Sequence, residues 1–211
     1  AMSNEVLMDS DPAIDAVVRD DVINGLRTVE DTKFIRGDGT QNTPTGLRYL
    51  ALAGNVFASA PAAPTAPTVA EVKSELGTAA LKLRQNNSRM LRPAWILSSR
   101  TFQYLLDLQD ANSNDALPEL KEGTLRGIPF AVTNNVPEDL GGGSDESEIY
   151  LADFADVVIG DGADTQGIRV DVDQSFGFNA DQTHMRVIAR NDINARHAGS
   201  ISVITAVRWG A

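Results

Sequence analysis

The chain has 211 residues, a net charge of −11, and 42% hydrophobic and 22% charged residues, which is ordinary for a globular protein that buries a core. Its acidity argues against a nucleic-acid-binding surface, because neutralising phosphates requires clustered Lys and Arg. There is no cysteine, which excludes disulfides and thiolate metal sites, and no apolar run long enough for a membrane-spanning helix.

The first residues, Ala1-Met2-Ser3-Asn4, do not begin a signal peptide, since no basic region precedes an apolar one. An alanine ahead of a methionine resembles a cloning remnant, and a helical pattern follows almost at once. We therefore expect a fragment that has lost an N-terminal part.

The pattern predicts a first helix over residues 10–34, with Ser10 as N-cap and Pro12 in the first turn, where a missing N–H costs little. Its apolar residues recur at helical spacing and form one stripe. They are Ile14, Val17, Val18, Val22, Leu26 and Val29. The stripe fits a core-facing helix and, equally well, a helix that also lines a contact between subunits.

Between Gly54 and Thr68, the run Ala58–Pro67 is rich in proline and small residues, which favours an extended, exposed connector and marks a boundary. Thr68 and Glu71 then have the spacing of a capping box. They open a second amphipathic helix, which is predicted to end near Asn86-Asn87-Ser88.

Further along, Pro93–Leu97 is predicted to be a short buried strand, and Ser98 or Ser99 to cap a third helix. The apolar positions of that helix face one way; they are Phe102, Leu105, Leu106 and Leu108. Asp110–Asp115 is polar turn material and Gly141–Ser144 a loop tip. Later strands are predicted at Gly127–Thr133, Glu148–Ala152, Ala155–Ile159, Ile168–Asp173, Thr183–Asn191 and Ile201–Trp209. The chain is therefore α+β, with helices early and antiparallel strands late.

Two sequence patterns suggest ligand-binding sites, but a structural role explains each of them better. Gly37-Asp38-Gly39 lacks the lysine that a phosphate loop requires and follows a helix instead of a strand, so a helix exit is favoured. A group of aspartates suggests a calcium or magnesium site, but the spacing after Asp161 does not fit an EF-hand. The group is Asp153, Asp156, Asp161, Asp164, Asp171 and Asp173. Asp171 and Asp173 share one face of a strand, which favours a solvated sheet face.

The remaining polar candidates also point to surface roles. His184 and His197 lie near no nucleophile motif, so we interpret both as surface histidines. Basic residues gather at the end of the second helix, where cations suit the helix dipole, and they are a weak nucleic-acid signal. These residues are Lys82, Arg84, Arg89 and Arg92. We predict no catalytic, cofactor-binding or metal-binding residue.

Several segments together resemble the tailed-bacteriophage major capsid protein family. The first is a helix that closes on Glu30-Asp31 and leads through Phe34–Thr40 to Pro44-Thr45-Gly46. The others follow in the family's order. They are Trp95-Ile96-Leu97-Ser98 with Leu105-Leu106-Asp107, Leu125-Arg126-Gly127-Ile128-Pro129-Phe130, Tyr150-Leu151-Ala152-Asp153-Phe154, and the run Phe176–Trp209.

The resemblance implies the phage major capsid (HK-ninety-seven-type) fold, an α+β fold with a spine helix, a peripheral domain and an axial domain. Residues 1–60 would hold the spine helix and part of the peripheral domain, 61–140 the first part of the axial domain, and 141–211 closing strands shared by both. The family's N-terminal arm and extended hairpin loop are not found in this sequence. Thr183 and Arg190 stand where an isopeptide-forming asparagine and its assisting glutamate would fall, so we expect no such cross-link.

The function implied is that of a non-enzymatic structural subunit of an icosahedral phage or prophage capsid, forming pentamers and hexamers that enclose the genome. Its partners would be other copies and the scaffold, protease and portal proteins, with only non-specific DNA contact and no membrane. It would assemble in the bacterial cytoplasm and reside in the virion capsid.

The expected contact residues are exposed positions on the first helix, the connector and two loops. They are Asp15, Arg19 and Asp21, residues 58–67, Asp110–Asp115 and Gly141–Ser144. Charge pairs at such positions set orientation more than affinity. One alternative is an encapsulin-type nanocompartment shell protein, which shares the fold. Another is a metal-dependent hydrolase that uses the late aspartates.

Overall fold

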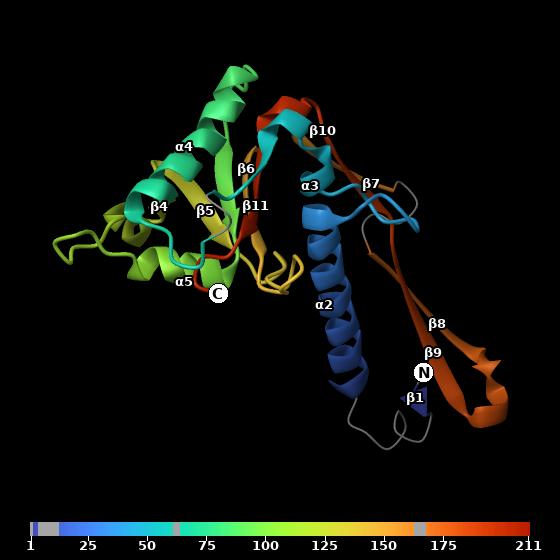
Figure 1. The fold of residues 1–211 in the computed structure, drawn as a ribbon. Helices are drawn as coiled ribbons and strands as arrows, with labels where there is room; N and C mark the ends of the chain where they lie inside the picture. The colour runs from blue at the N-terminus through green and yellow to red at the C-terminus, as the bar shows by residue number, and fades with distance from the viewer. Residues whose placement is uncertain (1, 4–12, 61–63, 163–167) are drawn as a thin grey trace. The chain divides into compact units, whose positions relative to one another are not determined.

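A computed structural model of the chain describes residues 2–3, 13–60, 64–162 and 168–211 (Figure 1). The chain divides into two units, one of residues 1–31 and 159–192 and the other of residues 32–158 and 193–211. The boundary falls inside three elements, namely helix α2 (Ala13–Arg36) and strands β7 (Val157–Asp161) and β10 (Asn191–Ala195). β7 and β10 pair with each other. Within the described residues no helix is long and apolar enough to cross a membrane.

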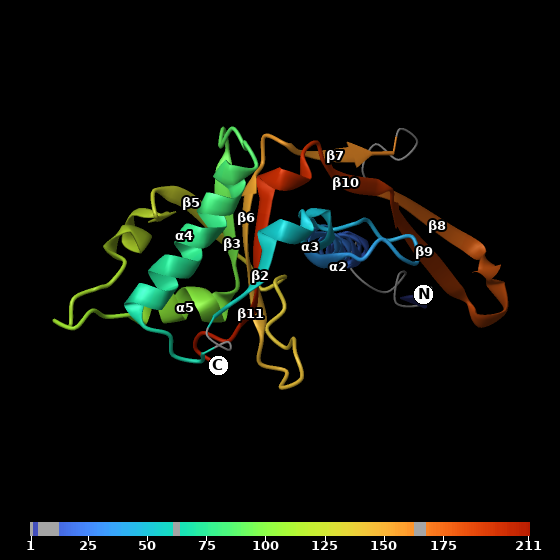
Figure 2. The ribbon, with the colours of Figure 1, turned by 45° about the horizontal axis from the view of Figure 1, so that its top comes forward.

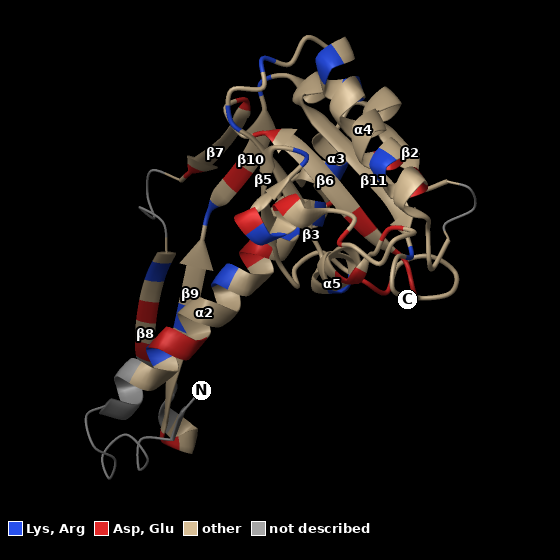
Figure 3. Ribbon diagram, turned by 90° about the vertical axis from the view of Figure 1, so that its left-hand side faces the viewer, with Lys and Arg blue, Asp and Glu red and all other residues tan. Residues whose placement is uncertain are grey.

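The first unit holds most of α2 and a three-stranded antiparallel sheet in the order β1-β9-β8. The strands are β1 (Met2–Ser3), β8 (Ile168–Gly177) and β9 (Gln182–Ala189), and the short 3-10 helix η3 (Phe178–Ala180) joins the last two. β8 carries the basic Arg169 and the acidic Asp171 and Asp173 (Figure 3). Asp171 accepts hydrogen bonds from Arg169 Nε at 2.8 Å and from Arg186, its partner across the strands, at 2.9 Å. This pairing fits the predicted solvated sheet face.

Helix α2 confirms the predicted first helix but corrects its expected burial. It ends at Arg36, two residues beyond the predicted end, while Ser10 and Pro12 lie outside the described residues. Of the two alternatives for its apolar stripe, an ordinary core-facing helix does not fit three valines, since Val17, Val22 and Val29 are 62%, 39% and 56% exposed. Helical spacing shows that a face is apolar but does not show what covers it. The exposed valines agree with the alternative of a helix that lines a contact between subunits.

The second unit is built on a six-stranded sheet in the order β2-β11-β6-β3-β5-β4. Its strands are β2 (Val56–Ala58), β3 (Pro93–Leu97), β4 (Thr124–Leu125), β5 (Ile128–Val132), β6 (Ser147–Asp153) and β11 (Ile201–Val207). Its α-helices are α3 (Leu47–Leu50), α4 (Val69–Gln85) and α5 (Ser99–Asp107). Short 3-10 helices are η1 (Ala53–Asn55), η2 (Pro118–Glu122) and η4 (Ala198–Ser200).

The expectation of purely antiparallel late strands is wrong for this sheet. β3 pairs with β5 in parallel and β11 pairs with β2 in parallel, whereas β6 is antiparallel to both of its neighbours. The reason for the first pair is that the chain passes through α5 between β3 and β5, and a crossover of this kind returns it in the same direction. Figure 2 shows α4 and α5 alongside the strands of the sheet.

Both faces of the sheet are covered, which explains the continuous burial of β6. Side chains alternate between two cores along each strand. Ile149 and Leu151 join the core formed with α4 and α5, while Tyr150 and Ala152 join a second core with Ile35. The β6–β11 pair is therefore the shared wall of two cores.

Two helix starts confirm the predictions from local sequence. At α4 the Thr68 hydroxyl accepts the Glu71 N–H and the Glu71 carboxylate accepts the Thr68 N–H, which makes the capping box complete. At α5 the Ser98 side chain accepts the Thr101 N–H.

The predicted connector, Ala58–Pro67, begins at the last residue of a strand. Residues 56–58 form strand β2, because Val56 and Phe57 suit an edge strand and the prolines begin only afterwards. Ser59 then donates its hydroxyl to the buried carboxylate of Glu75 at 3.0 Å. Residues 61–63 lie outside the described residues.

The Gly37–Gly46 segment is a helix exit, as predicted. The Gly37 N–H bonds Lys33 O at 2.7 Å, which ends α2, and the Gly46 N–H bonds Gly37 O at 2.8 Å, which closes the loop. Hydrogen bonds from the N–H and hydroxyl of Thr40 hold the pKa of Asp38 below its usual range. The chain thus turns sharply between α2 and α3 through its own hydrogen bonds.

We predict that Gly46→Ala destabilises the protein by about 1–3 kcal/mol, the usual range for forced overpacking. A Cβ at residue 46 would lie 2.6–2.7 Å from backbone atoms of Gly37, Arg36 and Lys33, none of which can move aside. Gly54→Ala is the matched control, because a Cβ there meets nothing within 4 Å. Urea unfolding of both variants measures the difference, and equal stabilities would contradict the close approach.

Candidate functional site

A buried carboxylate joins the exit of α2 to the central sheet. Glu148 on β6 is 2% exposed. Its two oxygens accept hydrogen bonds from Arg36 Nε at 3.1 Å and Arg48 Nε at 2.9 Å, and it also accepts the hydroxyl of Tyr150. Burial, followed by the neighbouring Glu148 charge, raises the pKa of Tyr150 well above its usual value, so the phenol remains a donor.

This group, which we call the Glu148 cluster, fixes local geometry in the second unit. Arg36 is the last residue of α2 and Arg48 lies in α3, so one carboxylate holds both sides of the Gly37–Gly46 loop. A buried charge is tolerated only when it is paired and hydrogen-bonded, and Glu148 meets both conditions.

A second buried carboxylate anchors the turn between α4 and β3, residues 86–92. Asp153 is fully buried, and its oxygens accept the N–H groups of Arg92 at 2.9 Å, Leu91 at 3.0 Å and Ala155 at 3.2 Å. Burial alone would raise the pKa of Asp153, but these N–H donors outweigh it and the pKa lies below its usual range. The turn is therefore held by its backbone, while the side chains of Arg89, Leu91 and Arg92 are exposed.

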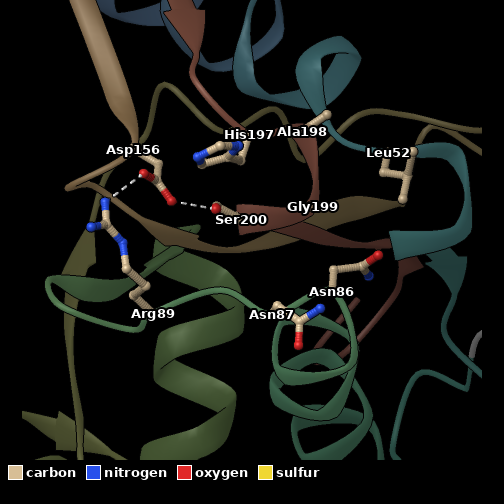
Figure 4. A pocket seen from close by; sticks show the side chains of 9 residues that line it. All are labelled: Leu52, Asn86, Asn87, Arg89, Asp156, His197, Ala198, Gly199 and Ser200. Carbon is tan, nitrogen blue, oxygen red and sulfur yellow. Dashed lines mark hydrogen bonds and ion pairs between the residues drawn. The ribbon is translucent and has the colours of Figure 1, made fainter.

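Beside this turn lies a polar pocket of about 430 Å³ (Figure 4). It is lined by Leu52, Asn86, Asn87, Arg89, Asp156, His197, Ala198, Gly199 and Ser200. Asp156 is 2% exposed, and one of its oxygens accepts the Ser200 hydroxyl at 2.6 Å. The other oxygen lies 3.5 Å from the Arg89 guanidinium and has no hydrogen-bond donor among the described residues.

One wall of the pocket is held by two asparagine side chains, of which Asn55 is buried. Asn86 donates to the Asn55 side chain at 2.8 Å, and Asn55 donates to the carbonyls of Gly199 and Ile201. Residue 199 has room only for glycine, since a Cβ there would lie 2.7 Å from the Asn86 Cβ. The pocket is thus a structured feature of the second unit.

The pocket does not have the arrangement of a catalytic triad. Serine, histidine and aspartate all line it, but Ser200 donates directly to Asp156, whereas a triad places histidine between the two. Among the described residues no group of three or more His, Cys, Asp or Glu could hold a metal ion.

The aspartates singled out in the sequence do not form one site. Asp153 and Asp156 are buried and used as described above, while Asp171 and Asp173 lie on β8 in the first unit and Asp164 lies outside the described residues. His184 lies on β9 opposite Asp173. His197 is an exposed surface residue as predicted, but it also lines the pocket, which the sequence did not indicate.

The predicted contact residues are distributed over both units. Arg19 and Asp21 are exposed on α2, and Asp15 lies in the same helix with its side chain outside the described residues. In the second unit, Asp110–Asp115 is an exposed turn in which Asp110 accepts N–H groups of its own loop at 2.8 and 3.0 Å. Gly141–Ser144 is a second exposed turn.

The positions expected to correspond to isopeptide residues both lie in the first unit. Thr183 is a buried residue of β9, and Arg190 lies at the start of the segment leading to β10.

The chain matches the phage capsid family over residues 1–206. It is 33% identical over 202 residues to the major capsid protein of Klebsiella oxytoca phage phiKO2, an alignment that covers 92% of this chain and 47% of that protein. The chain therefore spans about half the length of this curated relative.

Solved structures share the fold. The capsid of a native GTA particle superposes with a TM-score of 0.73 at 18% identity, covering 100% of this chain and 70% of that one. An encapsulin complex from Synechococcus elongatus gives a TM-score of 0.58 at 14% identity, covering 89% and 63%. At such identities the likeness concerns the fold alone, and it confirms the predicted α+β capsid fold.

We predict that Glu148→Gln destabilises the protein by about 1–3 kcal/mol, the range for losing charged hydrogen bonds at a buried group. The change leaves Arg36 and Arg48 without an anionic partner. Asp115→Asn, which breaks an exposed pair with Lys121, is the control and should cost less than about 1 kcal/mol. Chemical unfolding measures both, and equal costs would contradict a structural role for the cluster.

We also predict a pH signature for Asp153. Because its pKa is lower in the folded protein than in the unfolded chain, its stabilising contribution is present above about pH 4 and is lost as the pH falls through the folded value. Asp153→Asn should therefore be less stable than wild type at pH 7, with a gap that narrows in acid. Thermal melts from pH 7 to pH 3 test this, with exposed Asp139→Asn as control, and a constant gap would refute it.

Proposed function

The chain belongs to the phage capsid family, and from that membership we propose that it is a structural subunit of an icosahedral phage or prophage capsid. Its copies assemble into pentamers and hexamers that enclose the genome. The observation that carries the proposal is the family match over nearly the whole chain, supported by a fold shared with a capsid along its full length.

The physical features of the chain suit repeated self-contact. A sheet buried on both faces supplies a unit that keeps its shape, while exposed valines on α2 and two charged or flexible turns supply surface. Head-to-tail contacts between different surfaces close rings when the rotation between copies is fixed. A net charge of −11 adds repulsion between copies, which short-range contacts must offset and which salt screens.

Under this proposal α2 acts as the spine helix. Residues 1–60 contribute it and part of a peripheral domain, residues 61–140 the first part of an axial domain, and residues 141–211 the closing strands of both. The protein works without catalysis, resides in the virion capsid and is assembled in the bacterial cytoplasm. Scaffold, protease and portal proteins of the same phage are its proposed further partners, and DNA is contacted only non-specifically.

The encapsulin alternative rests on fold alone, at 14% identity. Neighbouring genes separate the two proposals, because terminase and portal genes accompany a phage capsid whereas a cargo-enzyme gene accompanies a nanocompartment.

We predict that the complete gene product, expressed alone or with its scaffold, forms closed particles. Light scattering behind size-exclusion chromatography and negative-stain microscopy measure this directly. Gly46→Ala, which disturbs the helix exit, should lower the yield of particles while Gly54→Ala should not. Monomers under every condition, with no rings or shells, would refute the proposal.

A further inference from the structure

The region around the α4–β3 turn differs in charge from the rest of the chain. Between Glu75 and Asp107 the sequence holds five basic residues and no acidic one, although the net charge of the chain is −11. The basic residues are Lys82, Arg84, Arg89, Arg92 and Arg100. Two of them are engaged internally, since Lys82 donates to Gly54 O and Arg100 to the carbonyls of Glu138 and Asp145.

The other three arginines are exposed at one end of α4. Within the described residues Arg84 and Arg92 form no ion pair with a carboxylate. The side chain of Arg89 is 58% exposed and makes one contact, at 3.5 Å, with Asp156. A guanidinium carries five N–H donors, so most of the donors of Arg89 are available to a partner.

Asp156 acts as a positioning residue for Arg89. It is buried and held by the Ser200 hydroxyl, and its other oxygen lies 3.5 Å from the guanidinium at the edge of the pocket (Figure 4). Asn87 and the imidazole of His197 line the same pocket. A guanidinium with neighbouring imidazole and carboxamide groups is suited to a carboxylate, which accepts several charge-assisted hydrogen bonds at once.

Exposed leucines beside these donors favour a protein partner over nucleic acid. Leu91 in the same turn is 61% exposed, and Leu52 in the pocket wall is 44% exposed. Protein–protein interfaces combine arginine with apolar side chains. The contacts that a nucleic-acid phosphate backbone makes are polar, so they would leave these leucines exposed. Asp153 also holds the backbone of the turn in place, which reduces the entropy lost on binding.

We propose that the α4–β3 turn and its pocket dock an acidic segment of a second copy of this chain, with a carboxylate of that segment bound by Arg89. This rests on the proposed shell function, and it names one of the surfaces that such a shell uses. Charge complementarity identifies the partner. The chain has a net charge of −11 and this region is basic, so its acidic residues lie elsewhere and are available on a second copy. The contact is head-to-tail, since a basic surface meets an acidic one.

The test compares charge reversals in the complete gene product. Arg89→Glu, Arg84→Glu and Arg92→Glu should each raise the concentration needed for assembly at least tenfold. Lys73→Glu, the same change at an exposed residue of α4, should leave it near the wild-type value. Arg84 and Arg92 form no ion pair with Asp156, so they keep the test valid if Arg89→Glu fails to fold, which circular dichroism reports.

Two further measurements separate this inference from the proposed function. Sedimentation velocity measures self-association even where no shell forms. An association that salt weakens and that Arg92→Glu abolishes supports the docking surface, whether or not particles form. Wild-type particles together with an unchanged assembly threshold in all three variants would overturn it. Fluorescence anisotropy with a duplex DNA oligomer gives a second contrary outcome. If the variants lose DNA binding while their assembly is unchanged, the surface binds DNA and the inference is overturned.

Discussion

The second unit depends on one buried carboxylate. Glu148 lies on β6, a strand covered on both faces, where an unpaired charge would be costly. Arg36 and Arg48 neutralise it from either side of the Gly37–Gly46 loop, so the end of α2 and the start of α3 are fixed against the sheet. The tight backbone contacts of Gly37 and Gly46 follow from that arrangement, because the loop must close within the reach of two arginines.

Two further buried carboxylates lie close to the surface of this unit. Asp153 satisfies the backbone of the α4–β3 turn, and Asp156, bound by Ser200, lies 3.5 Å from Arg89 at the pocket. The buried aspartates thus lie next to the exposed arginines of the turn, so the packing of the interior influences the geometry of this surface. The proposed shell function would use this property, since every copy of a shell subunit must offer the same contact in the same geometry.

Local sequence predicted the parts of the fold that local interactions determine. The Thr68 capping box, the Ser98 cap and the Gly-Asp-Gly exit involve residues within a few positions of each other, and all three are confirmed. The parallel pairing of β2 with β11 and the buried roles of Asp153 and Asp156 join distant segments, and no local pattern encodes them. The valines of α2 were predicted as an apolar face, but helical spacing does not show whether such a face is buried, and three of them are exposed.

The most direct test of the account is a cryo-EM reconstruction of particles formed by the complete gene product. The account predicts an icosahedral shell in which every subunit contains the six-stranded sheet with Glu148 between Arg36 and Arg48, and in which the arginines of the α4–β3 turn face another copy. Particles without icosahedral order, or subunits in which Glu148 is separated from both arginines, would contradict it.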